Sequence, residues 1–128
     1  MSDSHRKAAP AVDTSAVRER LAEAREAAAA QIAALGRDID AIVAANALAA
    51  VDDEHDPEGS STAFERAHTA ALLDQARQRL AALDDALERL GDGAYGRCEG
   101  CGEPIPPERL AILPAAAFCT RCAEVRGR

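Results

Sequence analysis

Apolar residues recur at intervals of seven in the second half of the chain. One series consists of Leu73, Leu80 and Leu87, and the other of Ala76, Leu83 and Leu90. Two apolar positions in every seven form a narrow stripe along one side of an α-helix, the pattern of a coiled-coil helix packed against a partner. The repeat therefore predicts a long helix whose apolar surface is too narrow for a thick globular core.

The limits of this helix are indicated by residues that favour helix ends. Thr62 is followed three residues later by Glu65, a spacing that fits a capping box at a helix start. Gly91 comes directly after the last leucine of the repeat and is expected to end the helix. The prediction is a helix over residues 62–90.

A second stretch with helical spacing precedes this one. Asp13, Thr14 or Ser15 can cap its start, and the helix can continue to about Val51. Its apolar side chains follow at steps of three and four: Val17, Leu21, Ala24, Ala28, Ile32, Leu35, Ile39 and Ile42. Alanine, the best helix former, accounts for 32 of the 128 residues, whereas Leu, Ile, Val and Phe together account for 23. This composition favours long thin helices.

Residues 52–60 separate the two predicted helices and contain Pro57 and Gly59, which favour a turn. Helices joined by so short a connection pack antiparallel. We therefore expect a mainly α-helical chain with a coiled-coil hairpin over residues 14–91, whose tip is residues 52–60, after a flexible N-terminal segment, residues 1–13. A compact three- or four-helix bundle is the alternative, but the narrow apolar stripe favours two strands.

Four cysteines follow the predicted hairpin. Cys98 and Cys101 are separated by two residues, as are Cys119 and Cys122, and seventeen residues lie between the two pairs. This spacing is typical of a site in which four thiolates bind one Zn²⁺ ion. A closed four-thiolate site leaves no open position for catalysis, so the predicted zinc is structural, with one ion per chain. A redox-active cysteine pair or an iron–sulfur cluster is the alternative.

The residues around the cysteines predict a small zinc-finger domain over residues 92–128. Gly100 and Gly102 allow the backbone to turn tightly beside the first cysteine pair. Three arginines, which could offset the negative charge of a four-thiolate site or simply be solvated, are Arg97, Arg109 and Arg121. A short helix is expected after Cys119. The expected small core consists of Tyr95, Leu110, Ile112 and Phe118, although the two aromatic rings could instead stack on nucleic acid.

A longer pattern surrounds the four cysteines. It reads Gly93-x-Tyr95-Gly96-x-Cys98-x-x-Cys101-Gly102-x-x-Ile105, then Arg109-Leu110, Pro114 and Cys119-x-x-Cys122. This segment resembles the DksA/TraR family of C4-type zinc fingers. The resemblance implies a bacterial transcription regulator that binds RNA polymerase directly rather than DNA. It further implies that the hairpin enters the polymerase secondary channel, with its tip near the active-site magnesium ion, and modulates initiation, in some members together with ppGpp.

Five of the seven residues from position 52 to position 58 are acidic: Asp52, Asp53, Glu54, Asp56 and Glu58. Carboxylate oxygens are the ligands that Mg²⁺ prefers, and such a cluster suits a basic or metal-containing cavity in a partner. Taken alone, it could equally be a solubilising loop beside a helix N-terminus, where acidic residues are favoured. The family resemblance favours polymerase contact, with Asp53 and Asp56 at the family's tip aspartates and Glu58 in place of the family's alanine.

The charge balance limits the classes of partner. Fifteen basic and 22 acidic residues give a formal net charge of −7, which disfavours attraction to nucleic-acid phosphates or to an anionic membrane. We find neither a secretion signal nor an apolar run approaching the ~20 residues of a membrane span, so a cytoplasmic protein is expected.

The sequence contains no residue combination typical of a catalytic centre, so we expect no enzymatic activity. The leading prediction is a monomeric regulator that binds RNA polymerase, with no direct sequence-specific binding to DNA and with ppGpp as a possible ligand of the joint interface. A nucleic-acid-binding zinc ribbon and a coiled-coil dimerisation module are the alternatives.

Overall fold

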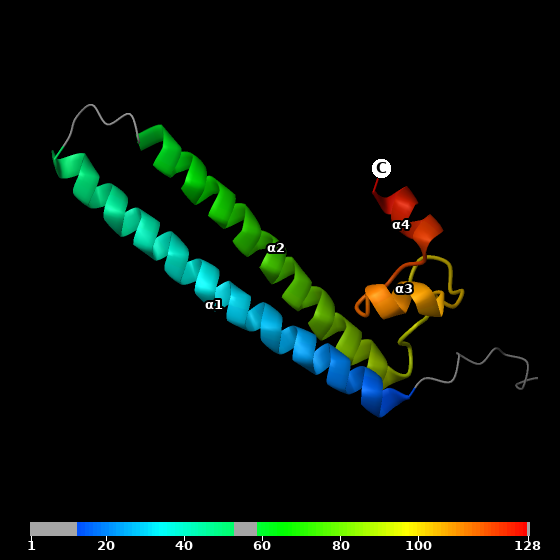
Figure 1. Ribbon diagram of the computed structural model, residues 1–128. Coiled ribbons are helices and arrows are strands. Elements are labelled where there is room, and N and C mark those ends of the chain that lie inside the picture. Colours follow the sequence, from blue (N-terminus) through cyan, green and yellow to red (C-terminus); the bar gives the residue numbers. More distant parts are fainter. Residues whose placement is uncertain (1–12, 53–58, 128) are drawn as a thin grey trace, which may run out of the picture. The chain divides into compact units, whose positions relative to one another are not determined.

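The computed structural model describes residues 13–52 and 59–127, with side chains for residues 13–48 and 61–127. This part of the chain contains two long and two short helices (Figure 1): α1, Thr14–Asp52; α2, Gly59–Asp92; α3, Pro107–Ile112; and α4, Thr120–Arg126. The extended pairing among these residues is one isolated β-bridge, between Arg97 and Pro104. The prediction of a mainly α-helical fold is confirmed.

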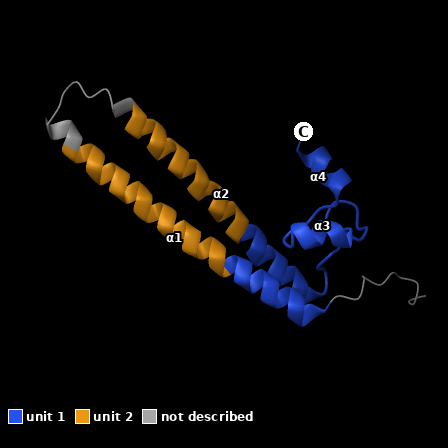
Figure 2. Cartoon of the chain, viewed as in Figure 1, with its two compact units in different colours: residues 1–25, 81–128 blue, residues 26–80 orange. Residues whose placement is uncertain are grey.

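The chain divides into two compact units (Figure 2). Unit 1 consists of residues 1–25 and 81–128, and unit 2 of residues 26–80. In each unit a segment of α1 lies beside a segment of α2. Because only six residues connect the two helices, α1 and α2 form the predicted helical hairpin. The residues that follow α2, 93–127, are called the knob below.

The part of the hairpin in unit 2 is held by a thin seam. Its buried side chains are mostly small: Ala28, Thr69, Leu73 and Ala76. The Thr69 hydroxyl donates a hydrogen bond to the carbonyl of Glu65 one turn earlier, so the buried polar side chain among the described residues of this unit has a partner. At the surface, the guanidinium of Arg79 donates to the side-chain oxygen of Gln31 at 2.8 Å. Alanines let the helix backbones approach closely, but they bury little apolar area.

The part of the hairpin in unit 1 is packed more heavily. Leu21 of α1 is fully buried, and it shares this unit with buried residues of α2, namely Leu83, Ala86 and Leu90. An exposed ion pair between Arg25 and Asp84 also joins the two helices. Each buried leucine contributes about 1.5–3 kcal/mol, so the apolar stabilisation per turn is larger here than between paired alanines.

The first helix begins as its sequence indicates. The carboxylate of Asp13 accepts a hydrogen bond from the backbone N–H of Ala16 at 3.2 Å, which is the contact of an N-cap residue. The helix then continues to Asp52, one residue beyond the expected end.

The second helix is longer than expected at both ends. It begins at Gly59, so Thr62 lies inside the helix and the predicted capping box at Thr62 and Glu65 is wrong as a helix start. Residues 59–61 contain no proline, and extending an existing helix costs little because each added residue gains a hydrogen bond.

Gly93, not Gly91, ends this helix. The backbone of Gly93 has φ +79°, a conformation that residues with a side chain rarely adopt. The N–H of Gly93 bonds to the carbonyl of Leu90, and the N–H of Ala94 bonds to that of Arg89. This pair of bonds is a Schellman motif, which satisfies the last carbonyls of the helix.

The core of the knob differs from the expected one. Tyr95 is buried and Leu110 and Phe118 are half-buried, but Ile112 is 78% exposed, so its predicted burial is wrong. Ile112 is the last residue of the six-residue helix α3, which buries no residue. Ile105 takes the core position instead: it follows the β-bridge, and its N–H bonds to the carbonyl of Gly96 at 2.7 Å.

Neither long helix carries an apolar stretch able to cross a bilayer, and the same holds for the other helices that the structure describes.

Candidate metal centre

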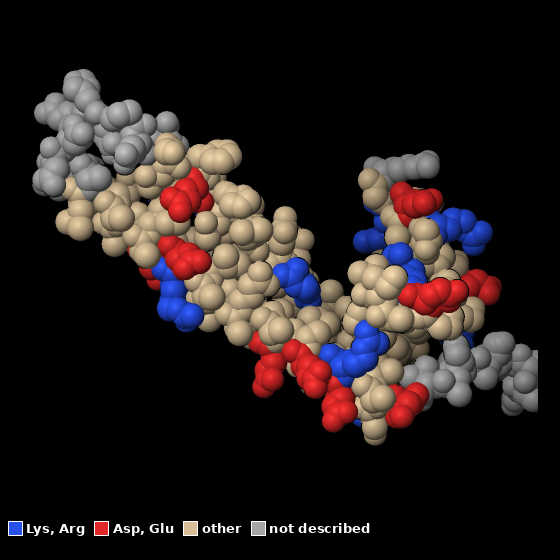
Figure 3. Space-filling view, viewed as in Figure 1, with Lys and Arg blue, Asp and Glu red and all other residues tan. Residues whose placement is uncertain are grey.

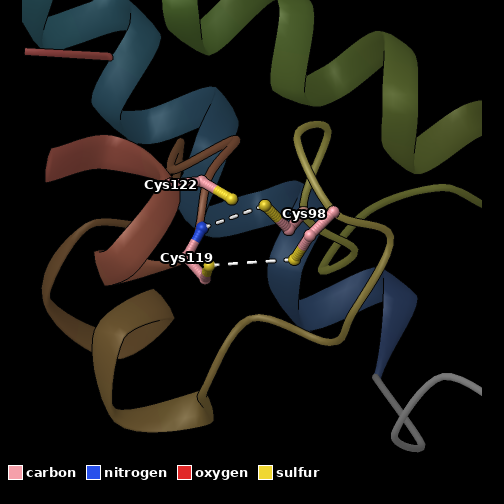
Figure 4. A group of neighbouring side chains, drawn as sticks. Cys98, Cys119 and Cys122 are labelled. Carbon is pink, nitrogen blue, oxygen red and sulfur yellow. Dashed lines mark hydrogen bonds between the residues drawn. The ribbon is translucent and has the colours of Figure 1, made fainter. Parts of the chain in front are cut away.

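The four cysteine thiols meet in the knob. The Sγ atoms of Cys98, Cys101, Cys119 and Cys122 all lie within 4.8 Å of one another. Cys98 and Cys101 belong to the loop after α2, whereas Cys119 directly precedes α4 and Cys122 lies in its first turn. Figure 4 shows the thiols of Cys98, Cys119 and Cys122 directed toward a common centre. The structure thus brings together the four residues that the sequence selects as metal ligands.

The first cysteine pair sits in a tight loop closed by backbone hydrogen bonds. The N–H of Cys98 bonds to the carbonyl of Glu103, and the N–H of Gly102 bonds back to the carbonyl of Cys98. Gly102 has φ +78°, as its predicted role in a tight backbone requires. The loop therefore holds these two thiols on one side of the centre although it contains no helix.

Gly100 is required because the second cysteine pair approaches its backbone closely. A Cβ atom at this position would lie 2.9 Å from Sγ of Cys122 and 3.1 Å from its Cβ. Real Cβ atoms do not come so close to other atoms, so any side chain here would displace Cys122. Gly100 does not adopt a positive φ, so glycine is required here by this close contact and not, as predicted, by a tight backbone turn.

Backbone N–H groups favour the thiolate form of Cys98. Burial by itself would raise the pKa of this thiol, but its Sγ accepts hydrogen bonds from the N–H groups of Cys119, at 3.2 Å, and Gly100, at 3.3 Å. With further hydrogen bonds from Cys101 and Cys122, these contacts lower the pKa of Cys98 to about 6. One of the four ligands is thus prepared to bind a cation at neutral pH.

Cys122 behaves in the opposite way. Its thiol shares hydrogen bonds with Cys98 and Cys119, which stabilise the protonated form and, together with burial, raise its pKa to about 12. Four sulfur atoms so close together cannot all carry a negative charge unless a cation lies among them. A metal ion supplies the compensating positive charge in place of the protons.

The geometry of the donor set fits a tetrahedral metal ion. With Zn–S bonds of about 2.3 Å, two sulfurs of a tetrahedral site are about 3.8 Å apart. The Sγ atoms of Cys101 and Cys119 lie 3.9 Å apart. The cluster offers four thiols, which is one of the donor sets found in structural zinc sites. This centre can therefore hold a metal ion.

Two helix arginines, which the sequence does not single out, connect the knob to the hairpin within unit 1. The guanidinium of Arg20 in α1 donates to the carbonyl of Ala111 at 2.9 Å. Arg89, in the last turn of α2, donates to the carbonyl of Ala116 at 3.4 Å and lies 3.7 Å from the carboxylate of Glu99. No local sequence signal marks these arginines, because their partners lie 91 and 27 residues away.

A tyrosine adds a third link within the knob. The hydroxyl of Tyr95 donates to the carbonyl of Pro114 at 2.7 Å, and burial raises the pKa of this hydroxyl, against the opposing effect of Arg20 and Arg89. Its ring and its hydroxyl thus hold the loop that leads to Cys119. Its predicted core role is confirmed.

The three arginines near the cysteines, Arg97, Arg109 and Arg121, differ in their hydrogen-bond partners. Arg97 donates to the carbonyl of Gly102 at 3.0 Å, and Arg109 donates to the carbonyl of Phe118 at 2.9 Å. Both therefore hold loops that carry cysteines. Arg121 is exposed and forms no hydrogen bond or ion pair with any described residue.

The tip residues are the part of the predicted site that the structure does not describe. Asp53, Glu54, Asp56 and Glu58 lie outside the described residues. Asp52 is the last residue of α1, and its side chain is likewise outside the described part.

Comparison with known proteins shows which family of zinc fingers the knob is similar to. The family described as "Prokaryotic dksA/traR C4-type zinc finger" matches residues 93–126, which include all four cysteines. This segment belongs to the DksA/TraR family of zinc fingers. An uncharacterised protein of Aquifex aeolicus (strain VF5) is 43% identical over 61 residues, which cover 44% of this chain and 42% of the relative.

Two relatives carry informative names. The RNA polymerase-binding transcription factor DksA of Caulobacter vibrioides (strain NA1000 / CB15N) is 37% identical over 65 residues, which cover 51% of this chain and 46% of the relative. The solved structure of transcription factor DksA2 from Pseudomonas aeruginosa matches with a TM-score of 0.70 and 26% identity, over 89% of this chain and 82% of that one. The matched regions span less than half the length of the two curated relatives, whereas the structural similarity includes the hairpin.

Proposed function

We propose that this chain is a transcription regulator that binds RNA polymerase directly and modulates initiation. The observation that carries the proposal is the combination of a DksA/TraR zinc finger with a long helical hairpin, which is similar over 89% of the chain to transcription factor DksA2. The Caulobacter relative named as an RNA polymerase-binding factor supports the same partner.

In this proposal, Cys98, Cys101, Cys119 and Cys122 hold one Zn²⁺ ion. The ion supplies cross-linking and no catalytic chemistry, because four thiolates occupy all its coordination positions. The cross-link joins the loop after α2 to α4, and Arg20 and Arg89 connect these loops to the helices. The knob therefore orients the hairpin for its partner. Zinc analysis of the purified protein should give one equivalent per chain, retained in mild oxidant; iron or a disulfide would contradict this role.

The proposed role of the hairpin is to place the tip acids, Asp52, Asp53, Glu54, Asp56 and Glu58, in the secondary channel of the polymerase. Two helices of 39 and 34 residues are about 58 and 51 Å long at 1.5 Å per residue, long enough to reach into a deep channel. The acidic tip suits a channel that leads to a bound magnesium ion.

The first experiment is binding to purified core RNA polymerase, with and without a zinc chelator. We expect direct binding that the chelator abolishes, because the knob loses its cross-link. Salt-sensitive binding to bare DNA in the absence of polymerase would instead favour a nucleic-acid-binding zinc ribbon. A stable dimer in sedimentation would favour the dimerisation module over the proposed monomer.

The second experiment separates the tip from the rest of the hairpin. Asp53→Asn with Asp56→Asn should leave folding and polymerase binding intact and abolish the effect on initiation in a purified transcription assay. Asp38→Asn with Asp40→Asn, two exposed acids of α1, removes the same charge elsewhere and should leave the effect intact. Equal effects of the two pairs would contradict a specific role of the tip. The same assay with added ppGpp tests whether that ligand participates.

A further inference from the structure

The excess negative charge of the proposed zinc centre has to be compensated within the knob. Four thiolates carry four negative charges, and one Zn²⁺ ion carries two positive ones. The ligand thiols lose their protons when the ion binds, so binding leaves negative charge on the sulfur atoms. N–H groups and cations close to the sulfur atoms therefore favour zinc binding.

Two of the four cysteines differ in the groups that can share this charge. The Sγ atom of Cys98 accepts hydrogen bonds from the backbone N–H groups of Cys119, at 3.2 Å, and Gly100, at 3.3 Å. Among the described residues, the Sγ atom of Cys122 shares hydrogen bonds only with other thiols, and these bonds disappear when zinc replaces the thiol protons. The thiolate of Cys122 therefore depends on charged side chains or water nearby.

A hollow of about 500 Å³ lies beside the thiol cluster, and Cys122 is part of its wall. Its charged lining residues are two arginines and one acid: Arg121, Arg126 and Glu99. Glu99 lies 3.7 Å from Arg89, which partly compensates the charge of its carboxylate. The side chains around the hollow therefore carry a net positive charge beside a sulfur atom that carries negative charge in the zinc-loaded centre.

Neither arginine of the hollow donates to a carbonyl of the described residues. Arg121 forms no hydrogen bond or ion pair with any of them. The guanidinium of Arg126 lies over the ring of Phe118, 4.3 Å from its centroid. This ring is close to Cys122, because a Cβ atom at Gly100 would lie 3.5 Å from Cδ1 of Phe118 and 2.9 Å from Sγ of Cys122. Stacking on Phe118 therefore holds the positive charge of Arg126 on the Cys122 side of the centre.

The helix α4 carries charges of both signs, and Figure 3 shows basic and acidic side chains close together over it. Its charged residues are Arg121, Glu124 and Arg126, and Glu124 is not part of the lining of the hollow. The helix thus places both of its arginines, but not its acid, at the hollow. This arrangement favours the two arginines as the source of compensating charge for Cys122.

We propose that Arg121 and Arg126 stabilise the thiolate of Cys122 in the zinc-loaded centre through their positive charge, as backbone N–H groups stabilise the thiolate of Cys98. They act across the hollow and do not bind the ion themselves. The assignment depends on the proposed zinc centre, but not on the proposed binding to RNA polymerase. The alternative is that both guanidinium groups are merely solvated, in which case the zinc affinity does not depend on them.

The test measures the zinc affinity of the full chain by competition with a chromogenic chelator. Arg121→Gln with Arg126→Gln should weaken zinc binding by about three- to ten-fold, the size expected for the loss of two exposed charge interactions. Arg121→Lys with Arg126→Lys keeps both charges and should stay within about two-fold of the unaltered chain. Arg66→Gln with Arg77→Gln removes the same charge from exposed positions of α2; this matched control should also stay within about two-fold.

Salt separates an effect of charge from a loss of structure. In about 1 M NaCl, where the Debye length is about 3 Å, the difference in zinc affinity between the double glutamine variant and the unaltered chain should shrink to less than about two-fold. A difference that persists at this salt concentration overturns the proposal. An equal loss of affinity in the double lysine variant, or unchanged affinity in the double glutamine variant, also overturns it.

A single substitution keeps the test valid if the double glutamine variant folds poorly. Arg121→Gln breaks no hydrogen bond or ion pair among the described residues and should weaken zinc binding by about two- to three-fold. Unchanged affinity in this variant overturns the role of Arg121. Absence of zinc binding in the unaltered chain would contradict the metal centre itself, whereas equal affinities of all variants contradict only the role of the arginines.

Discussion

Along the hairpin, most of the buried side chains are alanines and leucines in the seam between α1 and α2, whereas in the knob they are Tyr95, Ile105 and Cys98, which is one of four clustered thiols. The hairpin gains its order from helix propensity and from many small contacts spread over long segments. The knob has two helices of six and seven residues, too short to be stable alone, and gains its order from a few groups. Most single substitutions in the hairpin should therefore change its free energy of unfolding only slightly. In the knob, substitution at a few positions should be enough to unfold it.

Loss of one metal ligand should have the largest effect. In Cys119→Ser we expect zinc to be lost and the ordered NMR signals of residues 93–127 to collapse, because zinc contributes on the order of 10–16 kcal/mol in small zinc fingers. Most far-ultraviolet helical signal should persist at low temperature, since α1 and α2 contain 39 and 34 residues and α3 and α4 only 6 and 7. Thr120→Ser, at the exposed neighbouring residue, is the control. A knob that stays ordered without zinc would contradict the conclusion that the knob, unlike the hairpin, depends on a few groups for its order.

Core truncation in the hairpin should have the next largest effect, and only where the seam is fully buried. Leu21→Ala should lower the free energy of unfolding by about 2–5 kcal/mol, because Leu21 has no exposed surface. Leu48→Ala, at a residue that is 71% exposed, should change it by less than about 0.5 kcal/mol. Urea denaturation followed by circular dichroism measures both. Equal costs at the two positions would contradict the packing described for α1.

Alanine in place of glycine should have opposite effects in the two regions. Gly100→Ala should weaken zinc binding by about 10- to 100-fold, the range seen for groups that surround metal ligands, because the new Cβ would lie 2.9 Å from Sγ of Cys122. Gly36→Ala, in α1, meets no atom within 4 Å and should stabilise the hairpin by about 0.5–1 kcal/mol. Competition with a chromogenic chelator and thermal unfolding measure the two effects. Stabilisation by both substitutions would show that Cys122 is not held against Gly100.

The smallest expected effect concerns proton release. Zinc binding displaces the protons of its thiol ligands. Because the knob is expected to lose its order without zinc, its zinc-free thiols should have ordinary pKa values of about 8.5, and about four protons should be released per zinc ion at pH 5 and at pH 7 alike. Calorimetry in buffers of different ionisation enthalpy measures this number. A fall of about one proton over that range would show that the zinc-free knob keeps the hydrogen bonds from Gly100 and Cys119 that lower the pKa of Cys98 to about 6.

Local sequence patterns predicted the hairpin well but missed its ends. The leucine repeat placed Leu73, Leu83 and Leu90 in the seam, where they are buried. The choice of Gly91 as the helix stop was wrong, because the pattern does not tell which of the two nearby glycines adopts the required turn. The choice depends on which backbone carbonyls find partners, here those of Arg89 and Leu90.

The knob was predictable in its ligands and only partly in its core. Two Cys-x-x-Cys pairs identify the thiol cluster because few other structures need that spacing. The core has no such periodicity, since Ile105 lies shortly before a short helix, Ile112 is the last residue of that helix, and either could face inward. The bond from Ile105 N–H to Gly96 turns the first inward, and the end of α3 leaves the second in solvent.

The amino-acid sequence by itself determined what is periodic or chemically specific: two long helices, a turn between them and four thiols spaced for one cation. Only the tertiary structure decided which arginines bond to carbonyls of the knob and which do not. Arg20, Arg89, Arg97 and Arg109 bond to carbonyls of the knob, whereas Arg121 and Arg126 line a hollow. All six look alike in the sequence, because a guanidinium gains a structural role from a carbonyl that folding places within reach, and that carbonyl can belong to a residue far away in the chain.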